Sequence, residues 1–523
     1  MTIGTIPLRW LGALAAGCAL AAGVHGQPLT PTEQAGRRLY HDGVDRAGRP
    51  IEARVAGSAT PLKGKAMACG NCHGEDGRGR AESGVDPGDV TWTELTKPYG
   101  HAHANSRRHG PYDRGSFIRS MRDGVDPAGN ALEPAMPRYD VDDANLDALI
   151  AYLKRLDRQF DAGITGTTLR IGTVLPTVGA AAAAGGDVQR VLQGYVDGVN
   201  QRGGVHGRKI QLVVESAGDD DASVRAALDR LLVKDPVLAL LAPITVRHER
   251  AFAAAAEQAR VPLVGPLTLF PEGAAASSTY VFHLLPGVAE LAEALAVRMH
   301  PVLGLSGRPI VLLHAADADG KAAAQAVEER LKARGYTGLV LEPVSPLQDL
   351  ATRLKQRKAS AVIVLSPGPS LTAVVKAASA EGLHPHWLVP APFVPPDILD
   401  WPAELDGRVM LAYPTLPTDR TAAGTAALMS ATGGTPSARH RAMQTTALGA
   451  SMVLVEGLSR AGRDLSRQKL LTALEGVQGF DTGLTPRIGY NADRRIGSYG
   501  AYAVRVDLAQ RTFVPMPDFI RLQ

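Results

Sequence analysis

Cysteine is scarce in this chain, which has three cysteines in 523 residues. One of them, Cys18, lies in an N-terminal segment where an early positive charge, Arg9, precedes a short apolar core. That pattern is typical of an export signal, here ending before Gln27. The exported chain would keep only Cys69 and Cys72, and this excludes a framework of several disulfides.

Long apolar runs and an excess of charge are also missing. No stretch matches the roughly 20 apolar residues that span a bilayer, so we expect a signal peptide at 1–26 and a soluble periplasmic remainder. The sequence LAAGC approaches a lipoprotein signal, and lipid anchoring at Cys18 is the alternative. The net charge of +4, without a long basic run, gives no reason to expect nucleic-acid binding.

The two remaining cysteines are followed directly by a histidine, in the stretch MACGNCHGEDG. A zinc site would need a second pair of ligands, and the chain has no second cysteine pair. C-x-x-C-H is the attachment signature of haem c, in which both thiols bind the vinyl groups and the histidine ligates the iron. The motif therefore predicts one covalent haem c, linked through Cys69 and Cys72 and ligated by His73.

A second iron ligand is expected further along the chain. Met136 lies in a proline-flanked loop, ahead of a helix that the apolar spacing predicts up to about Leu156. A thioether opposite His73 would favour reduced iron. Met121 is interpreted as a core methionine of a helix. Three histidines of a polar loop are interpreted as solvated surface: His101, His103 and His109.

Residues from about 28 to 158 resemble a class I cytochrome c. The resemblance rests on a short helix in TPTEQAGRRLYHDG, then CxxCH, a Met-Pro loop and a C-terminal helix that would cross the first. It implies Cys69 and Cys72 as thioether links, with His73 and Met136 as axial ligands. An iron with both axial positions filled has no open site, so the chain is expected to be an electron carrier and not an enzyme.

Beyond residue 168 the pattern changes to alternating strands and helices, beginning with TLRIGTVLP and DVQRVLQGYVDGVNQRGG. Such repeated units imply parallel sheets covered on both faces. About 350 residues are too many for one such sheet, so two lobes are expected. This part resembles the periplasmic binding proteins of the branched-chain amino acid type, through ordered segments such as LRIGTVLPTVG, VPLVGP, YVFHLLPG and LTALEGVQGFDTG.

The second resemblance implies two α/β lobes that are joined by a three-stranded hinge and close on a small ligand. The expected fold is a small all-α cytochrome c domain followed by this two-lobed α/β domain. We place the parts at these residues: signal peptide 1–26, cytochrome c domain 27–158, linker 159–167, ligand-binding domain 168–523, lobe one about 168–286 and 412–486, lobe two about 287–411 and 487–523.

Ligands of open α/β sheets lie at the carboxyl ends of strands, where helix N-termini offer donors. The resemblance leaves Thr245 and Thr268 as ligand contacts, although each is also explained as a helix cap. Asp319, which stands where amino-acid binders of the family have a tyrosine, is the third candidate ligand contact, and residues 391–393 lack the acid that pairs with the ligand's ammonium. A buried ammonium without a counter-charge is costly, so an ordinary amino acid is not the expected ligand.

The leading hypothesis is a periplasmic electron carrier whose binding domain senses a ligand or docks an electron partner. The expected partners are a periplasmic dehydrogenase as donor, an oxidase or another cytochrome as acceptor, and an unidentified small molecule. One alternative is the solute-binding component of an ABC importer, with an ABC permease as partner and an accessory haem. Another is a catalytic haem protein such as a peroxidase, which would need an open iron position.

Overall fold

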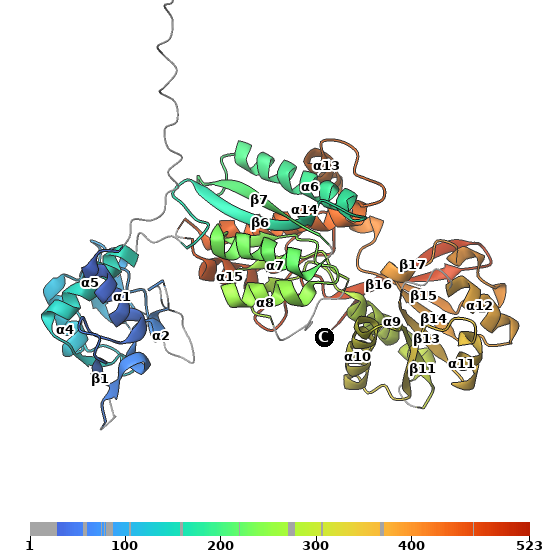
Figure 1. Ribbon diagram of the computed structural model, residues 1–523, viewed down its shortest axis with the longest axis horizontal. Coiled ribbons are helices and arrows are strands. Elements are labelled where there is room, and N and C mark those ends of the chain that lie inside the picture. Colours follow the sequence, from blue (N-terminus) through green and yellow to red (C-terminus); the bar gives the residue numbers. More distant parts are fainter. Residues whose placement is uncertain are drawn as a thin grey trace, which may run out of the picture. The chain divides into compact units, whose positions relative to one another are not determined.

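The structure is a computed structural model, and it describes residues 29–55, 60–74, 76–77, 79, 87–103, 106–156, 161–218, 220–269, 278–304, 307–366, 371–463 and 465–522. The predicted signal peptide and Cys18 lie outside these residues. The chain divides into two compact units, one within 1–159 and one within 160–523 (Figure 1). Among the described residues, none of the helices has the length and hydropathy of a membrane span.

The N-terminal unit is built around two helices, α1 (Pro31–Asp42) and α5 (Asp143–Leu156). Thr30 caps α1, because its hydroxyl accepts from the Glu33 amide while the Glu33 carboxylate accepts from the Thr30 amide. The two helices approach closely at Gly36, where an added Cβ would lie 2.0 Å from the carbonyl oxygen of Ala148. Only glycine therefore allows this approach.

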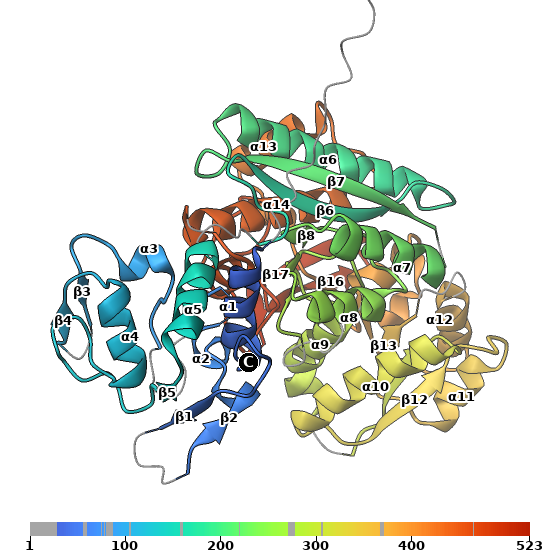
Figure 2. The same cartoon turned by 60° about the vertical axis from the view of Figure 1, so that its left-hand side comes forward.

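The rest of the N-terminal unit consists of short elements. Its helices are α2 (Gly70–His73), α3 (Trp92–Leu95), α4 (Arg114–Arg122) and the 3₁₀ turn η1 (Gly64–Met67). An antiparallel sheet in the order β2-β1-β5 contains β1 (Glu52–Arg54), β2 (Leu62–Lys63) and β5 (Arg138–Asp140). A separate hairpin pairs β3 (His101–Ala102) with β4 (Arg108–His109) (Figure 2). These strands add β-structure to a unit that the sequence predicts as all-α.

The C-terminal unit has two sheets, and the first is parallel throughout, in the order β10-β9-β8-β6-β7. Its strands are β6 (Thr168–Pro176), β7 (Lys209–Ala217), β8 (Ala239–Leu241), β9 (Leu263–Val264) and β10 (Val281–Phe282). One face packs on α6 (Ala182–Gln201), α13 (Ala422–Thr432), α14 (Arg441–Ala461) and α15 (Arg467–Glu475). The other packs on α7 (Asp221–Asp229), its π-helical extension η2 (Arg230–Lys234), and α8 (Glu249–Ala259) (Figure 1).

The second sheet has the order β12-β11-β13-β14-β15-β16-β17 and is parallel as far as β15. Its strands are β11 (Ile310–His314), β12 (Leu339–Pro343), β13 (Ala361–Leu365), β14 (His386–Pro390), β15 (Val409–Tyr413), β16 (Gly500–Asp507) and β17 (Thr512–Arg521). The last two strands are antiparallel. Helices α9 (Val288–Leu303) and α10 (Ala318–Ala333) lie on one face, and α11 (Leu350–Gln356) and α12 (Leu371–Ala380) on the other (Figure 1). Four 3₁₀ turns complete this lobe and its link to α13: η3 (Ala391–Phe393), η4 (Ile398–Asp400), η5 (Ala403–Leu405) and η6 (Pro417–Asp419).

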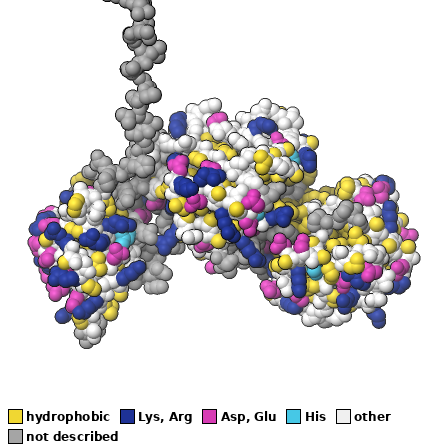
Figure 3. All heavy atoms as spheres, viewed as in Figure 1, with side chains coloured by type: hydrophobic (Ala, Val, Ile, Leu, Met, Phe, Trp, Pro, Cys, Tyr) yellow, Lys and Arg dark blue, Asp and Glu magenta, His cyan; other side chains and the backbone are white. Residues whose placement is uncertain are grey.

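The two sheets belong to two lobes with separate cores, and the chain passes between these cores three times. The passages lie between Leu284 and Val288, between Ala412 and Leu428, and between Tyr490 and Ala501. Lobe one is therefore assembled from two distant stretches of the sequence, as is lobe two. Charged side chains of both signs are interspersed over the face of the molecule in Figure 3.

Candidate haem site and ligand cleft

The two cysteines of the motif lie on a single helical turn. Cys69 is the N-cap of α2, and its carbonyl accepts from the amides of Cys72 at 3.2 Å and His73 at 2.9 Å. Cys69 is buried in the core of the unit, whereas Cys72 is exposed. Burial raises the pKa of the Cys69 thiol to about 12. Neither sulfur is part of a disulfide.

His73, on the same turn, is buried, and a backbone carbonyl fixes one of its two ring nitrogens. Its Nδ1 lies 3.1 Å from the carbonyl oxygen of Gly88, and a carbonyl can only accept, so Nδ1 carries the hydrogen. The lone pair is then on Nε2, as in histidines whose second nitrogen is fixed by a backbone carbonyl. Burial lowers the pKa of His73 below its ordinary value, which favours the neutral ring.

Met136 lies between α4 and β5 and is half-buried against the core that also contains Cys69. Its carbonyl accepts from the Arg138 guanidinium, and its amide donates to the Glu133 carbonyl at 3.0 Å, so the loop is held at both ends. Met121 is buried on α4, as expected of a core methionine. Two thiols, an imidazole and a thioether are the donors that a haem c takes, and the residues present fit that group.

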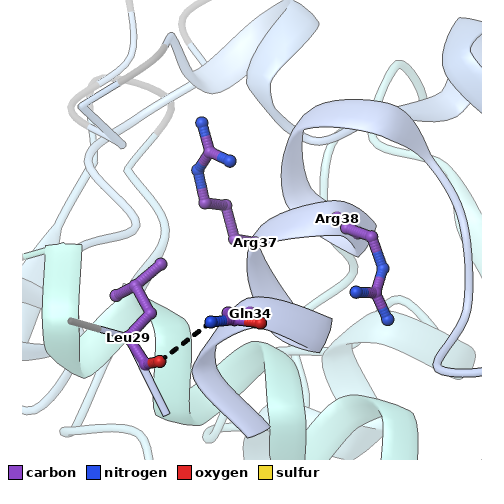
Figure 4. A pocket seen from close by; sticks show the side chains of 4 residues that line it. All are labelled: Leu29, Gln34, Arg37 and Arg38. Carbon is purple, nitrogen blue, oxygen red and sulfur yellow. Dashed lines mark hydrogen bonds between the residues drawn. The ribbon is translucent and has the colours of Figure 1, made fainter. Parts of the chain in front are cut away.

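A shallow hollow of about 470 Å³ lies on the same unit, over α1 (Figure 4). The Gln34 side chain donates to the Leu29 carbonyl at 3.0 Å across it, while Arg37 and Arg38 extend in different directions. None of the four predicted haem residues lines this hollow, so it is a surface feature separate from them.

The C-terminal unit contains a cleft of about 1620 Å³ between its lobes. Lobe one contributes residues of α7 and α8, and lobe two contributes residues of α10 together with Leu365 and Phe393. The cleft is larger than the roughly 300–1,000 Å³ of ordinary small-molecule sites. It therefore offers room for the lobes to approach each other around a ligand.

The structure brings one of the three predicted ligand contacts into this cleft. Asp319 lies in the first turn of α10 and lines the cleft. Thr245 is only 1% exposed, and its hydroxyl donates to the Leu267 carbonyl at 3.4 Å. The Thr268 hydroxyl donates to the carboxylate of Glu249 at 2.6 Å. Neither threonine is part of the cleft lining, and neither caps a helix.

Several charged residues of the cleft were missed by sequence reasoning. His248 Nδ1 and an oxygen of Asp221 are 2.8 Å apart, and both residues line the cleft. Arg225 and Arg247 are exposed and line it from lobe one, and Asp317 lines it from lobe two. The run VRHER, in the loop that follows the buried strand β8, was a visible signal, because a charged run after a parallel strand lies at the ligand edge of a sheet.

Comparison with known proteins identifies both units. A sequence profile of periplasmic binding proteins matches residues 168–511, and one of cytochrome c matches residues 63–157. The chain belongs to the periplasmic binding protein family and carries a cytochrome c domain ahead of its binding domain. The Leu/Ile/Val-binding protein BraC3 of Rhizobium johnstonii is 26% identical over 206 residues, which are 38% of this chain and 55% of that protein. The chain thus spans about half the length of this curated relative.

Solved structures share the fold of the binding domain. A fatty acid ABC transporter substrate-binding protein from Thermomonospora curvata has a TM-score of 0.52 and 19% identity, covering 70% of this chain and 95% of its own. A branched-chain amino acid ABC transporter protein from Thermus thermophilus with bound valine has a TM-score of 0.52 and 16% identity, covering 68% and 96%. The ligands in these titles differ in chemistry, so the shared fold leaves the ligand open.

Proposed function

We propose that the chain is a periplasmic electron-transfer protein with one covalent haem c, joined to a domain that binds a small molecule. Cys69 and Cys72 form the thioether links, and His73 and Met136 ligate the iron. The observation that carries the proposal is the buried, neutral His73, held by Gly88 on the same turn as both thiols. When bound, the haem would supply one-electron transfer between ferric and ferrous iron.

The residues of the chain have separable tasks in this proposal. The two thiols bind the haem, the Gly88 carbonyl holds the hydrogen on Nδ1 of His73, and the core around Cys69 excludes water. His73 and Met136 would hold the iron, and the haem would supply electron exchange with partner proteins without a position for substrate. A periplasmic dehydrogenase as donor, and an oxidase or another cytochrome as acceptor, fit this role.

The haem assignment is tested on the full chain, produced in a host that attaches haem c. We expect one haem per chain that survives denaturation, together with a reversible one-electron redox titration. Replacing both Cys69 and Cys72 by alanine should remove the covalent haem. The matched control Cys18→Ala should keep it, because Cys18 lies ahead of the domain. Haem that is lost from the original chain on denaturation would contradict the proposal.

We also propose, against the expectation drawn from residues 391–393, that the ligand is a small polar molecule with charges of both signs, because acids from another loop line the cleft. Arg225 and Arg247 line the cleft from lobe one, and Asp317 and Asp319 line it from lobe two. A ligand with an anionic and a cationic end would find a partner in each lobe and hold the lobes together. Because such charge-assisted hydrogen bonds contribute about 1.5–3 kcal/mol each, the loss of one is expected to weaken binding about tenfold or more.

The test is a thermal-shift panel on the full chain, comparing zwitterions with amides, fatty acids and dicarboxylates. A ligand that binds only the folded domain stabilises it by about 2.7 kcal/mol when its concentration is a hundred times Kd. The melting temperature of the domain then rises. We expect zwitterions to give the shift, Asp319→Asn to weaken it, and Glu329→Gln to leave it unchanged. Glu329 is exposed on the same helix but does not line the cleft. A shift from uncharged or purely anionic compounds alone would overturn this ligand class.

The match to BraC3 favours a second candidate, the solute-binding component of an ABC importer with an accessory haem. In that case a ligand-loaded chain should stimulate uptake by a cognate ABC permease, and the haemless Cys69→Ala/Cys72→Ala variant should do so equally well. An electron carrier should instead lose its function with the haem.

A further inference from the structure

Three histidines of the cytochrome c domain lie together on the hairpin of β3 and β4. His101 is the direct antiparallel partner of His109, and His103 follows His101 by two residues. Residues that are paired across a hairpin, and residues two apart on one strand, lie on the same face. Their ring nitrogens accordingly lie within 4.8 Å of one another. The polar loop of the sequence is thus a cluster of imidazoles.

The rings are packed against one another and against the core. The Nε2 atoms of His103 and His109 share a hydrogen bond at 3.0 Å, which a bound ion would replace, and the rings of His101 and His109 stack with their centroids 4.7 Å apart. His109 is buried, and its ring meets the edge of Tyr112, a core residue, at 5.1 Å. The buried ring of His109 therefore fixes the position of the cluster, and the three histidines are not freely rotating surface side chains.

Two of the rings have a nitrogen that could bind an ion: one is in His109 and the other is in His101. His109 Nδ1 is 2.7 Å from the carbonyl oxygen of Gly110, so Nδ1 carries the hydrogen and the lone pair is on Nε2. His101 Nε2 is buried without a hydrogen-bond partner among the described residues, while its Nδ1 lies 3.9 Å from Glu94. A buried polar nitrogen without a partner is costly, and a bound ion would remove that cost.

The distances suit one ion shared by three nitrogens. Zinc–nitrogen bonds of about 2.0–2.1 Å in a tetrahedral site place ligand nitrogens about 3.3 Å apart. The cluster spans 3.0 Å to at most 4.8 Å, so small rotations of the rings reach that spacing. The nearest basic side chains are already paired, since Arg107 bonds Asp126 at 3.0 Å and Lys97 bonds Glu94. These pairs reduce the repulsion that a bound cation would meet.

We propose that His101, His103 and His109 bind a divalent ion of the zinc or copper class, with a fourth position left to water. Neutral imidazole suits Zn²⁺ and Cu²⁺, whereas Mg²⁺ and Ca²⁺ take oxygen ligands. Three protein ligands with one open position are typical of sites that exchange a ligand. The site uses none of the predicted haem residues, so it stands or falls independently of the haem assignment.

The experiment uses the full chain carrying its haem, without a polyhistidine tag, dialysed against a chelator and titrated with Zn²⁺ or with Cu²⁺. We expect one equivalent to bind, and the electron paramagnetic resonance spectrum of the Cu²⁺ form to show coordination by nitrogen. His103→Gln should weaken metal binding by about a hundredfold or more. Removing a residue that binds the metal directly costs more than the roughly 10- to 100-fold loss that is usual for residues bonded to the ligands. His300→Gln is the matched control, since His300 is an exposed histidine on α9 outside the cluster.

The haem absorption spectrum and the melting temperature of each variant show whether the domain still folds. His109→Gln alters the most buried ring. If it changes the haem spectrum or the melting temperature, the site is judged from His103→Gln alone, because His103 is less buried. Binding of either ion that weakens in His103→Gln and not in His300→Gln supports the site. Equal affinity in the original chain and in His103→Gln, or no bound equivalent of either ion, would overturn it.

Discussion

Replacing Gly36 by alanine is expected to unfold the cytochrome c domain or to leave it barely stable. The new Cβ would lie 2.0 Å from the carbonyl oxygen and 2.6 Å from the carbonyl carbon of Ala148, and 2.7 Å from Cβ of Tyr152. These atoms belong to the backbone and the base of a side chain, so no rotamer change relieves the clash. Helices α1 and α5 would have to separate.

The cost of that separation follows from what the helix pair buries. Leu39 and Tyr40 of α1, and Leu149 and Tyr152 of α5, are almost fully buried in the same core. Overpacking a core usually costs about 1–3 kcal/mol, and a clash with backbone is expected to exceed the upper end of that range. Such a loss is a large part of the roughly 5–15 kcal/mol that stabilises a domain.

The measurement is thermal unfolding of the full chain, followed by circular dichroism and by the haem absorbance. Gly115→Ala is the matched control, since Gly115 is exposed on α4 with no atom closer than 3.5 Å to an added Cβ. Alanine there should raise stability by about 0.5–1 kcal/mol through helix propensity. The same substitution is therefore expected to have opposite signs at the two positions. Equal melting temperatures would mean that α1 and α5 do not meet at Gly36.

Replacing Met136 by leucine is expected to lower the midpoint potential of the haem by on the order of 100 mV or more. Axial ligands move haem potentials over a range of about 0.8 V, and a thioether raises them. Leucine keeps the volume of methionine, so the fold should lose less than about 1.5 kcal/mol. The half-buried position of Met136 makes this a change of ligand with little repacking.

The check is a spectroscopic redox titration of the full chain beside the matched control Met121→Leu. Met121 is buried on α4, and its replacement should leave the potential nearly unchanged. The thioether–iron absorption band should disappear in Met136→Leu alone. If the band is lost in Met121→Leu instead, Met136 is not the ligand. A spectrum of two imidazole ligands in the original chain would contradict Met136 as the second ligand.

Local signals in the sequence predicted the helices that carry the haem domain. Thr30 and Gly43 bound α1, and Asp142 accepts from the Asn145 amide at the start of α5, and these residue types are typical of helix ends. Gly36 and Tyr40 are four residues apart, so helical spacing places them on the one face of α1 that meets Tyr152 of α5. The alternation of strands and helices predicted two lobes and their parallel sheets. Such patterns predict structure because each depends only on residues that are close in the sequence.

Features that depend on distant residues were not predictable. Strands of two residues, such as β3 and β4, have no periodicity to detect, so the pairing of His101 with His109 was invisible. Thr245 follows a buried strand, but its hydroxyl bonds Leu267 within the fold and does not line the cleft. Residues 391–393 lack an acid, and Asp317, from another strand–helix loop of the same lobe, lines the cleft together with the predicted Asp319.

The interleaving of the lobes bears on the order in which the chain matures. The last buried core residue of the cytochrome c domain is Leu156. The last one of lobe one is Tyr490, and the last one of lobe two is Leu522. Domains of a chain that emerges from its N-terminus fold as units, the first one first. The cytochrome c domain can thus fold before the rest of the chain has emerged. The binding domain, in contrast, has to wait for its last strands, because neither lobe is a continuous piece of sequence.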